Sequence, residues 1–278
     1  MARLCYKSKN LNRRFSRAAR IIADKISKID GVVGIVATGG IGRGYSDEFS
    51  DLDLIVYAEQ EKAKEIDSYI AIGQLLYKGI QYDTPVESYR KALRHKTPSV
   101  YWSQALRWTL ESSIILYDTD DRIADLIAAR VIYPEVERKK MVTDYRHWTD
   151  EILNYMYPTW KARGQVYNLA HLLRQAAENM ILWIYAQNGV FQPYTRKWLF
   201  YYLENGLVPE AGYFPRIKKA FTSSLATMAD VHTMRAELLT LCDQLGMGIR
   251  PISWEEVLVI NAGNWKKASE KTRQNLSW

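Results

Sequence analysis

The spacing of apolar residues predicts an alternation of helices and strands in the first half of the chain. Apolar residues recur at helical intervals from Phe15 to Ile29, and Gly31 ends this pattern. A β-branched apolar run of strand length follows at 32–38, and a second strand is expected over 52–58, after a glycine-rich turn. Further along we expect a helix over 61–77, a strand over 79–86, helical structure over 87–113 interrupted near Thr97-Pro98, a short buried strand over 114–117, and a helix from about residue 122.

After Pro134 the pattern changes and strand signals almost vanish. Helices are expected over 135–157, 164–188, 194–205, 214–245 and 253–271. The predicted architecture is therefore an α/β (α+β) domain with a mixed sheet over residues 1–130, followed by an all-α helical bundle over 131–278.

Composition narrows the classes of partner and compartment. The net charge of +7 favours a polyanionic partner, such as a nucleotide, a nucleic acid or an anionic surface, and the densest basic cluster spans Arg13 to Arg20. Cys5 and Cys242 are too few for a disulfide framework. No run reaches the ~18 consecutive apolar residues of a membrane span, and the polar N-terminus lacks the apolar stretch of a signal peptide. We expect a cytoplasmic protein without a membrane partner, and we leave its oligomeric state open.

Candidate chemistry gathers in the segment from Thr38 to Asp53. Gly39 and Gly40 open a turn whose backbone can approach an anion closely, because no Cβ intervenes. Asp51 and Asp53 lie on one face of the second strand, since strand side chains alternate, and they offer hard oxygen ligands to Mg²⁺. A phosphate seat beside metal ligands is the minimum needed to handle a nucleoside triphosphate.

This segment resembles the signature of the polymerase-β-like nucleotidyltransferase superfamily, and within it the bacterial antibiotic (aminoglycoside- and lincosamide-type) and minimal nucleotidyltransferases. The resemblance implies that Gly39 and Gly40 bind the nucleotide and that Asp51 and Asp53 bind metal. The superfamily often has serine at the second glycine position. This chain has Gly40 there, so backbone amides, Arg43 or Ser46 are left as possible phosphate contacts.

The resemblance also implies a third carboxylate from a neighbouring strand. Asp83, about thirty residues after Asp53 on the next predicted strand, is the best placed. It would be a shared metal ligand or the base that deprotonates the acceptor. Glu87 competes for this role if Pro85 does not break the strand, and Glu178 in the helical half is a further candidate base.

The predicted function is transfer of a nucleoside monophosphate, AMP from ATP, to a hydroxyl of a small-molecule acceptor with release of pyrophosphate, assisted by two Mg²⁺ ions. An antibiotic is one possible acceptor, and resistance would then be the role. Transfer to tRNA or protein is the enzymatic alternative, favoured by the basic cluster from Arg13 to Arg20. A non-catalytic binding partner of the toxin–antitoxin type is the alternative from another class. Tyr167, Trp183 and Trp198 are candidates for stacking on a base or a flat acceptor.

Overall fold

The computed structural model describes residues 8–72, 76–94, 100–193, 196–253 and 255–259. The chain divides into two compact units. The N-terminal unit contains Met1–Pro134 and the segment Val190–Tyr201, and the helical unit contains Glu135–Gly189 and Tyr202–Trp278. The sequence predicts a single boundary at residue 130, whereas here twelve residues from the second half of the chain, 190–201, belong to the N-terminal unit.

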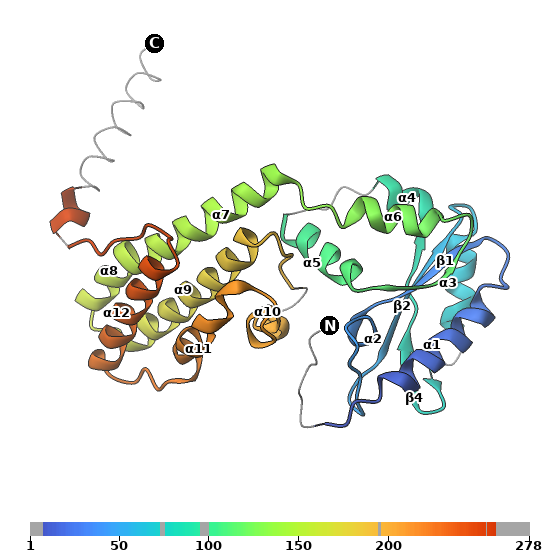
Figure 1. Ribbon diagram of the computed structural model, residues 1–278, viewed down its shortest axis with the longest axis horizontal. Coiled ribbons are helices and arrows are strands. Elements are labelled where there is room, and N and C mark those ends of the chain that lie inside the picture. The colour runs from blue at the N-terminus through green and yellow to red at the C-terminus, as the bar shows by residue number, and fades with distance from the viewer. Residues whose placement is uncertain (1–7, 73–75, 95–99, 194–195, 254, 260–278) are drawn as a thin grey trace, which may run out of the picture. The chain divides into compact units, whose positions relative to one another are not determined.

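A mixed sheet forms the centre of the N-terminal unit (Figure 1). Its strand order is β3-β4-β2-β1-β6, and β5 also pairs with β2. β1 is antiparallel to both β2 and β6, whereas β2 is parallel to β4 and β5. The strands are β1 (Val32–Ala37), β2 (Leu52–Ala58), β3 (Leu76–Tyr77), β4 (Ile80–Asp83), β5 (Val86–Ser88) and β6 (Ile114–Asp118). This arrangement, followed by a mainly helical C-terminal region, confirms the predicted fold class.

Helices cover both faces of the sheet. On one face, α1 (Asn12–Ile26) and α3 (Ala63–Ile72) pack their apolar sides against the buried residues of β1 and β2. On the other face, α4 (Tyr89–Arg94) and α6 (Arg122–Arg130) contribute Ala92 and Ile123 to a second cluster. The short α2 (Gly39–Gly42) and α5 (Val100–Glu111) complete the unit. Because both faces are covered, the strand ends are where polar chemistry can be placed.

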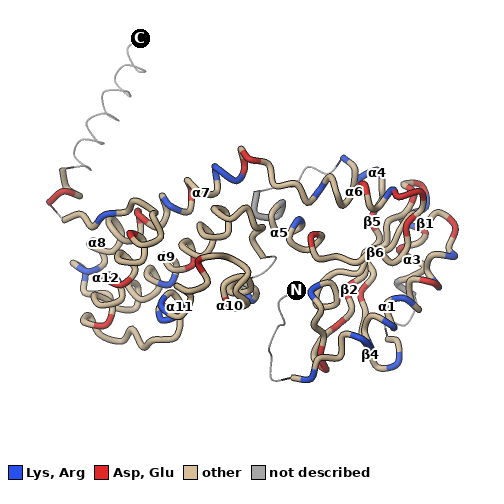
Figure 2. Tube along the Cα trace, viewed as in Figure 1, with Lys and Arg blue, Asp and Glu red and all other residues tan. Residues whose placement is uncertain are grey.

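The outer side of α1 carries the basic cluster expected from the sequence. The side chains of Arg13, Arg14, Arg17 and Arg20 are exposed, opposite the buried Phe15 and Ile22. Figure 2 shows basic positions along α1 in blue. This amphipathic division follows from apolar residues recurring every three to four positions.

Three local predictions for the N-terminal unit were wrong. The helix expected over 61–77 ends at Ile72, and Leu76–Tyr77 is the strand β3. The strand expected over 79–86 is divided at Thr84-Pro85, because proline has no N–H to donate to the ladder. The strand β6 is not buried: it lies at the edge of the sheet, and Ile114 and Ile115 are each 38% exposed.

The helical unit is built around α9 (Val166–Gln187), which is buried over most of its length. Contacts to α9 come from α7 (Glu135–Asp150), α8 (Tyr157–Ala162), α11 (Phe214–Thr222) and α12 (Met228–Gln244), as Figure 1 shows. A π-helical turn, η1 (Glu151–Met156), joins α7 to α8. A helix that is apolar around most of its circumference requires such a surround. None of the described helices combines the length and the apolar character needed to cross a lipid bilayer.

Two expected helices of the second half are replaced by shorter elements. The helix predicted over 214–245 is divided into α11 and α12, and Thr227 and Asp230 form a capping box that begins α12. Within the expected helix over 194–205, residues 194–195 lie outside the described part, and the described residues 196–205 form the 3-10 turn Arg196–Trp198 and α10 (Tyr201–Glu204). Most of the helix predicted over 253–271 lies outside the described residues. The described residues 255–259 of that range are helical.

Candidate active site

Two aspartates stand at the start of β2. Asp51 immediately precedes the strand and is exposed, and Asp53 lies within it and is half-buried. Leu52 and Leu54 alternate with them and are fully buried in the core. Alternation along the strand therefore directs both carboxylates to the side away from this core, as the sequence pattern predicts.

A third carboxylate comes from the neighbouring strand. In the parallel pair β2 and β4, Asp53 is directly in register with Asp83. Residues paired in this way project to the same side of the sheet. The structure thus brings Asp83 beside Asp53, where the sequence predicted a further carboxylate.

Electrostatics at Asp53 reflect this crowding. The pKa of the Asp53 carboxyl is raised above its ordinary value, first by burial and then by the negative charge of Asp51, with Asp83 adding to the effect. The positive charges of Arg43 and Lys197 act in the opposite direction. Within the described part of the chain, no three His, Cys, Asp or Glu side chains form a group that could hold a metal ion. The negative charges of Asp51 and Asp83 thus make ionisation of the Asp53 carboxyl less favourable.

The glycine turn is shaped by its contact with Asp53. Gly39 has a φ of +64°, and a Cβ at this position would lie 2.1 Å from Asp53 Oδ2. The backbone N–H of Thr38 donates to the carbonyl of Asp53 at 3.0 Å. A residue other than glycine would be strained in its backbone and would collide with the carboxylate. Gly39 thus allows the Asp53 side chain to lie directly against the turn.

Gly40 is required for a different reason. A Cβ here would lie 2.4 Å from the backbone oxygen of Tyr45, which is too close for any side chain. The backbone N–H of Tyr45 also donates to the carbonyl of Gly40 at 3.0 Å. The local fold of this loop explains why the chain departs from the serine that is common at this position.

Ser46 has a structural environment. Its side chain is fully buried, and its hydroxyl donates to the side-chain oxygen of Asn12 at 3.1 Å. Its carbonyl accepts from the N–H of Leu11 at 2.6 Å. Ser46 therefore ties the loop to the start of α1, and we leave it out of the phosphate contacts proposed below.

Arg43 is held between two indole rings. Its guanidinium carbon lies 4.3 Å from the ring centroid of Trp108 and 4.7 Å from that of Trp198. The two indoles are 6.2 Å apart, and Tyr201 packs edge-on against both. A planar guanidinium suits such stacking, whereas the ammonium of a lysine does not. We call Arg43, Trp108, Trp198 and Tyr201 the Arg43 cluster.

The Arg43 cluster explains why the segment 190–201 belongs to the N-terminal unit. Trp198 and Tyr201 come from this segment, and Arg43 follows the glycine turn directly. Lys197, whose charge acts on Asp53, is exposed beside Trp198. The sequence suggested a stacking role for Trp198 but no connection to the N-terminal unit, because nothing in the helical pattern marks a return of the chain to the sheet. Lys197 and Trp108 were missed as site residues for the same reason.

Of the other two predicted carboxylates, one lies apart from this group within the N-terminal unit and the other belongs to the helical unit. Glu87 is in register with Tyr57 on β2, four residues beyond Asp53, or about 13 Å along the strand. The offset between the paired strands is unchanged on either side of Pro85, so this proline interrupts the strand without shifting its register. Glu178 lies on α9 in the helical unit and is half-buried there. The carboxylates that the N-terminal unit brings together are those of Asp51, Asp53 and Asp83.

Comparison with known proteins finds a family match for part of the N-terminal unit. Residues 19–98 match the family described as nucleotidyltransferase domain. A solved structure, a nucleotidyltransferase-like protein from Exiguobacterium sibiricum, is similar to the chain with a TM-score of 0.46 and 13% sequence identity, over 82% of this chain and 74% of the other. No curated protein matches the chain.

Proposed function

We propose a specific reaction for this protein, supported by the match of residues 19–98 to the family described as nucleotidyltransferase domain. It moves a nucleoside monophosphate, AMP from ATP, onto a hydroxyl of a small-molecule acceptor and releases pyrophosphate. A cytoplasmic location, where nucleoside triphosphates are abundant, belongs to the same proposal. The observation that carries it is the group of carboxylates from adjacent strands, Asp53 and Asp83 in register, against the Gly39 turn.

The carboxylates fit Mg²⁺ as a partner. Mg²⁺ in such sites is usually held by one or two carboxylates together with substrate phosphates, rather than by an all-protein cage. Asp51 and Asp53 would supply the two protein ligands, and phosphate oxygens of the substrate would complete the coordination. The raised pKa of Asp53, caused by burial and by neighbouring negative charge, supports this, because a bound cation would offset that repulsion. When bound, Mg²⁺ would neutralise charge on the triphosphate.

The glycine turn is proposed as the seat of the triphosphate. Gly39 and Gly40 let a phosphate approach the backbone more closely than any residue with a Cβ would. Arg43 and Lys197 add positive charge close to Asp53. We assign Arg43 a positioning role, since its guanidinium is stacked between indoles, and Lys197 the role of an exposed cation facing the phosphates.

Asp83 is proposed as the general base. The acceptor oxygen attacks the α-phosphorus, its proton passes to an Asp83 carboxylate oxygen, and the bond from the α-phosphorus to the bridging oxygen breaks as pyrophosphate leaves. Exposure of Asp83 leaves its side chain accessible to an acceptor, unlike the half-buried Asp53. Glu178 remains the alternative base from the helical unit. Asp83→Asn and Glu178→Gln distinguish them, because the variant that lacks the base should lose most of kcat, whereas the other should retain it.

The acceptor is proposed to be a small hydroxyl compound, with antibiotics as the first class to test. The exposed basic face of α1 favours a second candidate, transfer to the end of a tRNA, because four arginines on one helix suit a phosphate backbone. Binding of tRNA that weakens steeply with salt, and less so after Arg13→Gln and Arg17→Gln, would support this second candidate.

The deciding experiment is a label-transfer assay. The full chain is incubated with Mg²⁺ and each α-³²P nucleoside triphosphate across panels of antibiotics, tRNA and proteins. We expect label from ATP on one small hydroxyl compound, with pyrophosphate released in equal amount, and no transfer by Asp53→Asn. Binding of ATP without turnover on any panel would contradict the enzymatic proposal and favour the non-catalytic alternative.

A further inference from the structure

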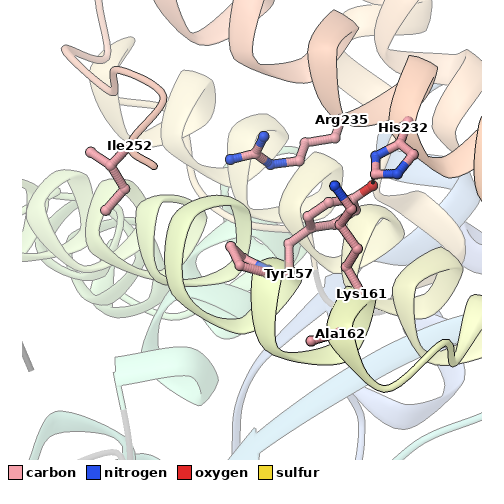
Figure 3. Close-up of a pocket in the computed structure, with 7 residues that line it drawn as sticks. Tyr157, Lys161, Ala162, His232, Arg235 and Ile252 are labelled. Atoms are coloured by element: carbon pink, nitrogen blue, oxygen red, sulfur yellow. Dashed lines mark hydrogen bonds between the residues drawn. The ribbon is translucent and has the colours of Figure 1, made fainter. Parts of the chain in front are cut away.

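A pocket of about 410 Å³ lies within the helical unit, between the end of α8 and the side of α12 (Figure 3). It is far in sequence from the Gly39–Asp53 segment and contains none of its residues. Its described lining residues are Tyr157, Pro158, Lys161, Ala162, His232, Arg235 and Ile252.

Positive charge dominates the polar part of this lining. Lys161, His232 and Arg235 are basic, and the described lining includes no Asp or Glu. The pKa of His232 is lowered, first by burial and then by the charges of Lys161 and Arg235. Both cations therefore act on the same small volume, and a neutral imidazole completes the polar surface near pH 7.

Tyr157 and His232 form a fixed pair at the pocket wall. The Tyr157 hydroxyl and His232 Nδ1 are 2.7 Å apart, within hydrogen-bonding distance, and Figure 3 shows the two groups meeting. Burial raises the pKa of Tyr157 to about 12, so its hydroxyl keeps its proton at neutral pH. The pair presents neutral hydrogen-bonding groups beside the two cations.

Arg235 is held in place before any ligand arrives. Its Nε donates to the carbonyl of Leu153 at 2.8 Å, and its Nη2 donates to Asn154 Oδ1 at 3.2 Å. Its guanidinium carbon lies 5.0 Å from the ring centroid of Tyr157. Leu153 and Asn154 belong to the π-helical turn η1, a type of turn often found at functional sites. Nη1 is the guanidinium nitrogen that these two bonds do not use, and a preorganised cation binds an anion with little further ordering cost.

We propose that this pocket binds a small organic anion, with Lys161 and Arg235 neutralising a carboxylate or phosphate group. Pro158, Ala162 and Ile252 would contact the apolar part of the same molecule. An anion without an apolar part would use only half of this lining, and a neutral molecule would leave two cations uncompensated. This site goes beyond the proposed nucleotidyl transfer and does not depend on it.

The first test is calorimetric titration of the full chain, without nucleotide, with phenyl phosphate, benzoate and the neutral analogue benzamide. We expect saturable binding of at least one of the two anions, with benzamide weaker by about tenfold or more. Tighter phenyl phosphate would identify a phosphate ligand, and tighter benzoate a carboxylate ligand. Equal affinity for benzamide and benzoate, or no saturable binding of either anion, would overturn the proposal.

The second test locates the bound anion. Lys161→Gln should weaken binding of the preferred anion by roughly tenfold, because it removes one charged contact. Arg163→Gln is the matched control: it removes one positive charge two residues away, where the guanidinium stacks 4.6 Å from the ring centroid of Trp160. Affinity in this control should stay within about twofold of the wild type. An equal loss in both variants would mean general attraction to a basic surface and would overturn the pocket assignment.

A third measurement follows the bound anion in the wild-type chain and uses a variant only to assign one signal. Carbon-13 NMR of labelled histidine side chains should show one signal that moves on anion binding, identified as His232 by its loss in His232→Gln. Movement of the other histidine signals instead would place the anion elsewhere. Because these titrations contain no nucleotide, their failure leaves the proposed nucleotidyl transfer untouched, and failure of the label-transfer assay leaves the pocket untouched.

Discussion

The two units differ in how fully the chain satisfies a polar side chain that it removes from solvent. In the helical unit, Asn154 is only 1% exposed, and its amide group takes part in four hydrogen bonds. Two are donated by its Nδ2 to Asp150 Oδ1 and the carbonyl of Arg250, and two are accepted by its Oδ1 from Arg235 and the N–H of Ile252. The chain itself provides for every polar atom of this amide, so Asn154 stabilises the fold.

Asp53 in the N-terminal unit has the contrasting environment. Its carboxylate is half-buried among other carboxylates, so burial and like charge both raise its pKa. Positive charge on Arg43 and Lys197 only partly offsets this effect. A carboxylate that the fold keeps in an unfavourable environment is a candidate for binding a cation or ligand from outside the chain. This difference is what we expect between a polar group that serves the fold and one that has the role proposed for Asp53.

Asp53→Asn should affect activity and stability in opposite directions. Loss of the carboxylate should reduce label transfer by about 10³-fold or more, because a metal ligand is lost. The free protein should nevertheless be slightly more stable, with Tm higher by about 1–3 °C near pH 7, because an unfavourable charge is removed.

The pH dependence of this gain follows from the direction of the pKa shift. A carboxyl with a raised pKa binds its proton more tightly in the folded protein than in the unfolded chain, so folding loses stability as pH rises and the group ionises. The Tm advantage of Asp53→Asn should therefore grow between about pH 4 and pH 7. Scanning calorimetry across this range measures it, and a variant less stable than wild type at neutral pH would contradict the assignment.

Gly39→Ala tests whether the glycine turn serves the carboxylate or only the backbone. Gly39 and Gly44 both have positive φ, at +64° and +80°, but only at Gly39 would a Cβ meet Asp53. Gly39→Ala and its control Gly44→Ala should each lower the free energy of unfolding by about 1 kcal/mol or somewhat more, because of backbone strain. Only Gly39→Ala should also reduce kcat/KM, by about 10²-fold, since the carboxylate must move. Steady-state kinetics with denaturant melts separates the two effects, and equal activity in the two variants would remove Gly39 from the site.

Asn154→Ala should show the reverse of Asp53→Asn. Four partner groups, three of them on half-buried residues, lose a hydrogen bond at once, so we expect a loss of about 2–4 kcal/mol and a Tm lower by about 5–10 °C. The exposed amide Gln175 on α9 provides the control, and Gln175→Ala should change stability by less than about 0.5 kcal/mol. A stability of Asn154→Ala close to wild type in urea unfolding would show that the four bonds do not act as described.

Lys197→Gln has the smallest expected effect and tests the segment that returns to the N-terminal unit. Removing this charge should raise the KM for the nucleotide by about three- to tenfold, with little change in kcat. It should also move the acid limb of the pH profile to higher pH, because the charge of Lys197 lowers the pKa of Asp53. Lys64→Gln, an exposed lysine of α3, is the control. An unchanged KM and pH profile would exclude Lys197 from the site.

Much of the N-terminal unit could be predicted because its signals are local. The strand β2 was expected over the residues it occupies, and the alternation of Asp51 and Asp53 with buried leucines follows from the two-residue period of any strand. The sequence predicted that Asp83 lies on the next strand after Asp53. Its register with Asp53 depends on strand pairing, which the spacing of residues does not specify.

Other features required the tertiary structure, because they depend on residues distant in the chain. Ser46 is removed from the surface by Asn12 and Leu11, which precede it by more than thirty positions. The Arg43 cluster joins residues separated by as many as 158 positions, from Arg43 to Tyr201, and no periodic pattern encodes such contacts.

Local sequence was therefore enough for the elements and for the residue types that carry the chemistry, since backbone geometry and side-chain alternation act over a few residues. It also marked the glycine turn and the aspartates at the start of β2 as the candidate centre of that chemistry. Packing decided which charges surround Asp53, which serine is buried, and which late segment belongs to the N-terminal unit. Packing also created the basic pocket of the helical unit, where Lys161 and Arg235 come from different helices. Electrostatic and steric environments are set by the distance between atoms, and that distance is fixed only when the whole core has formed.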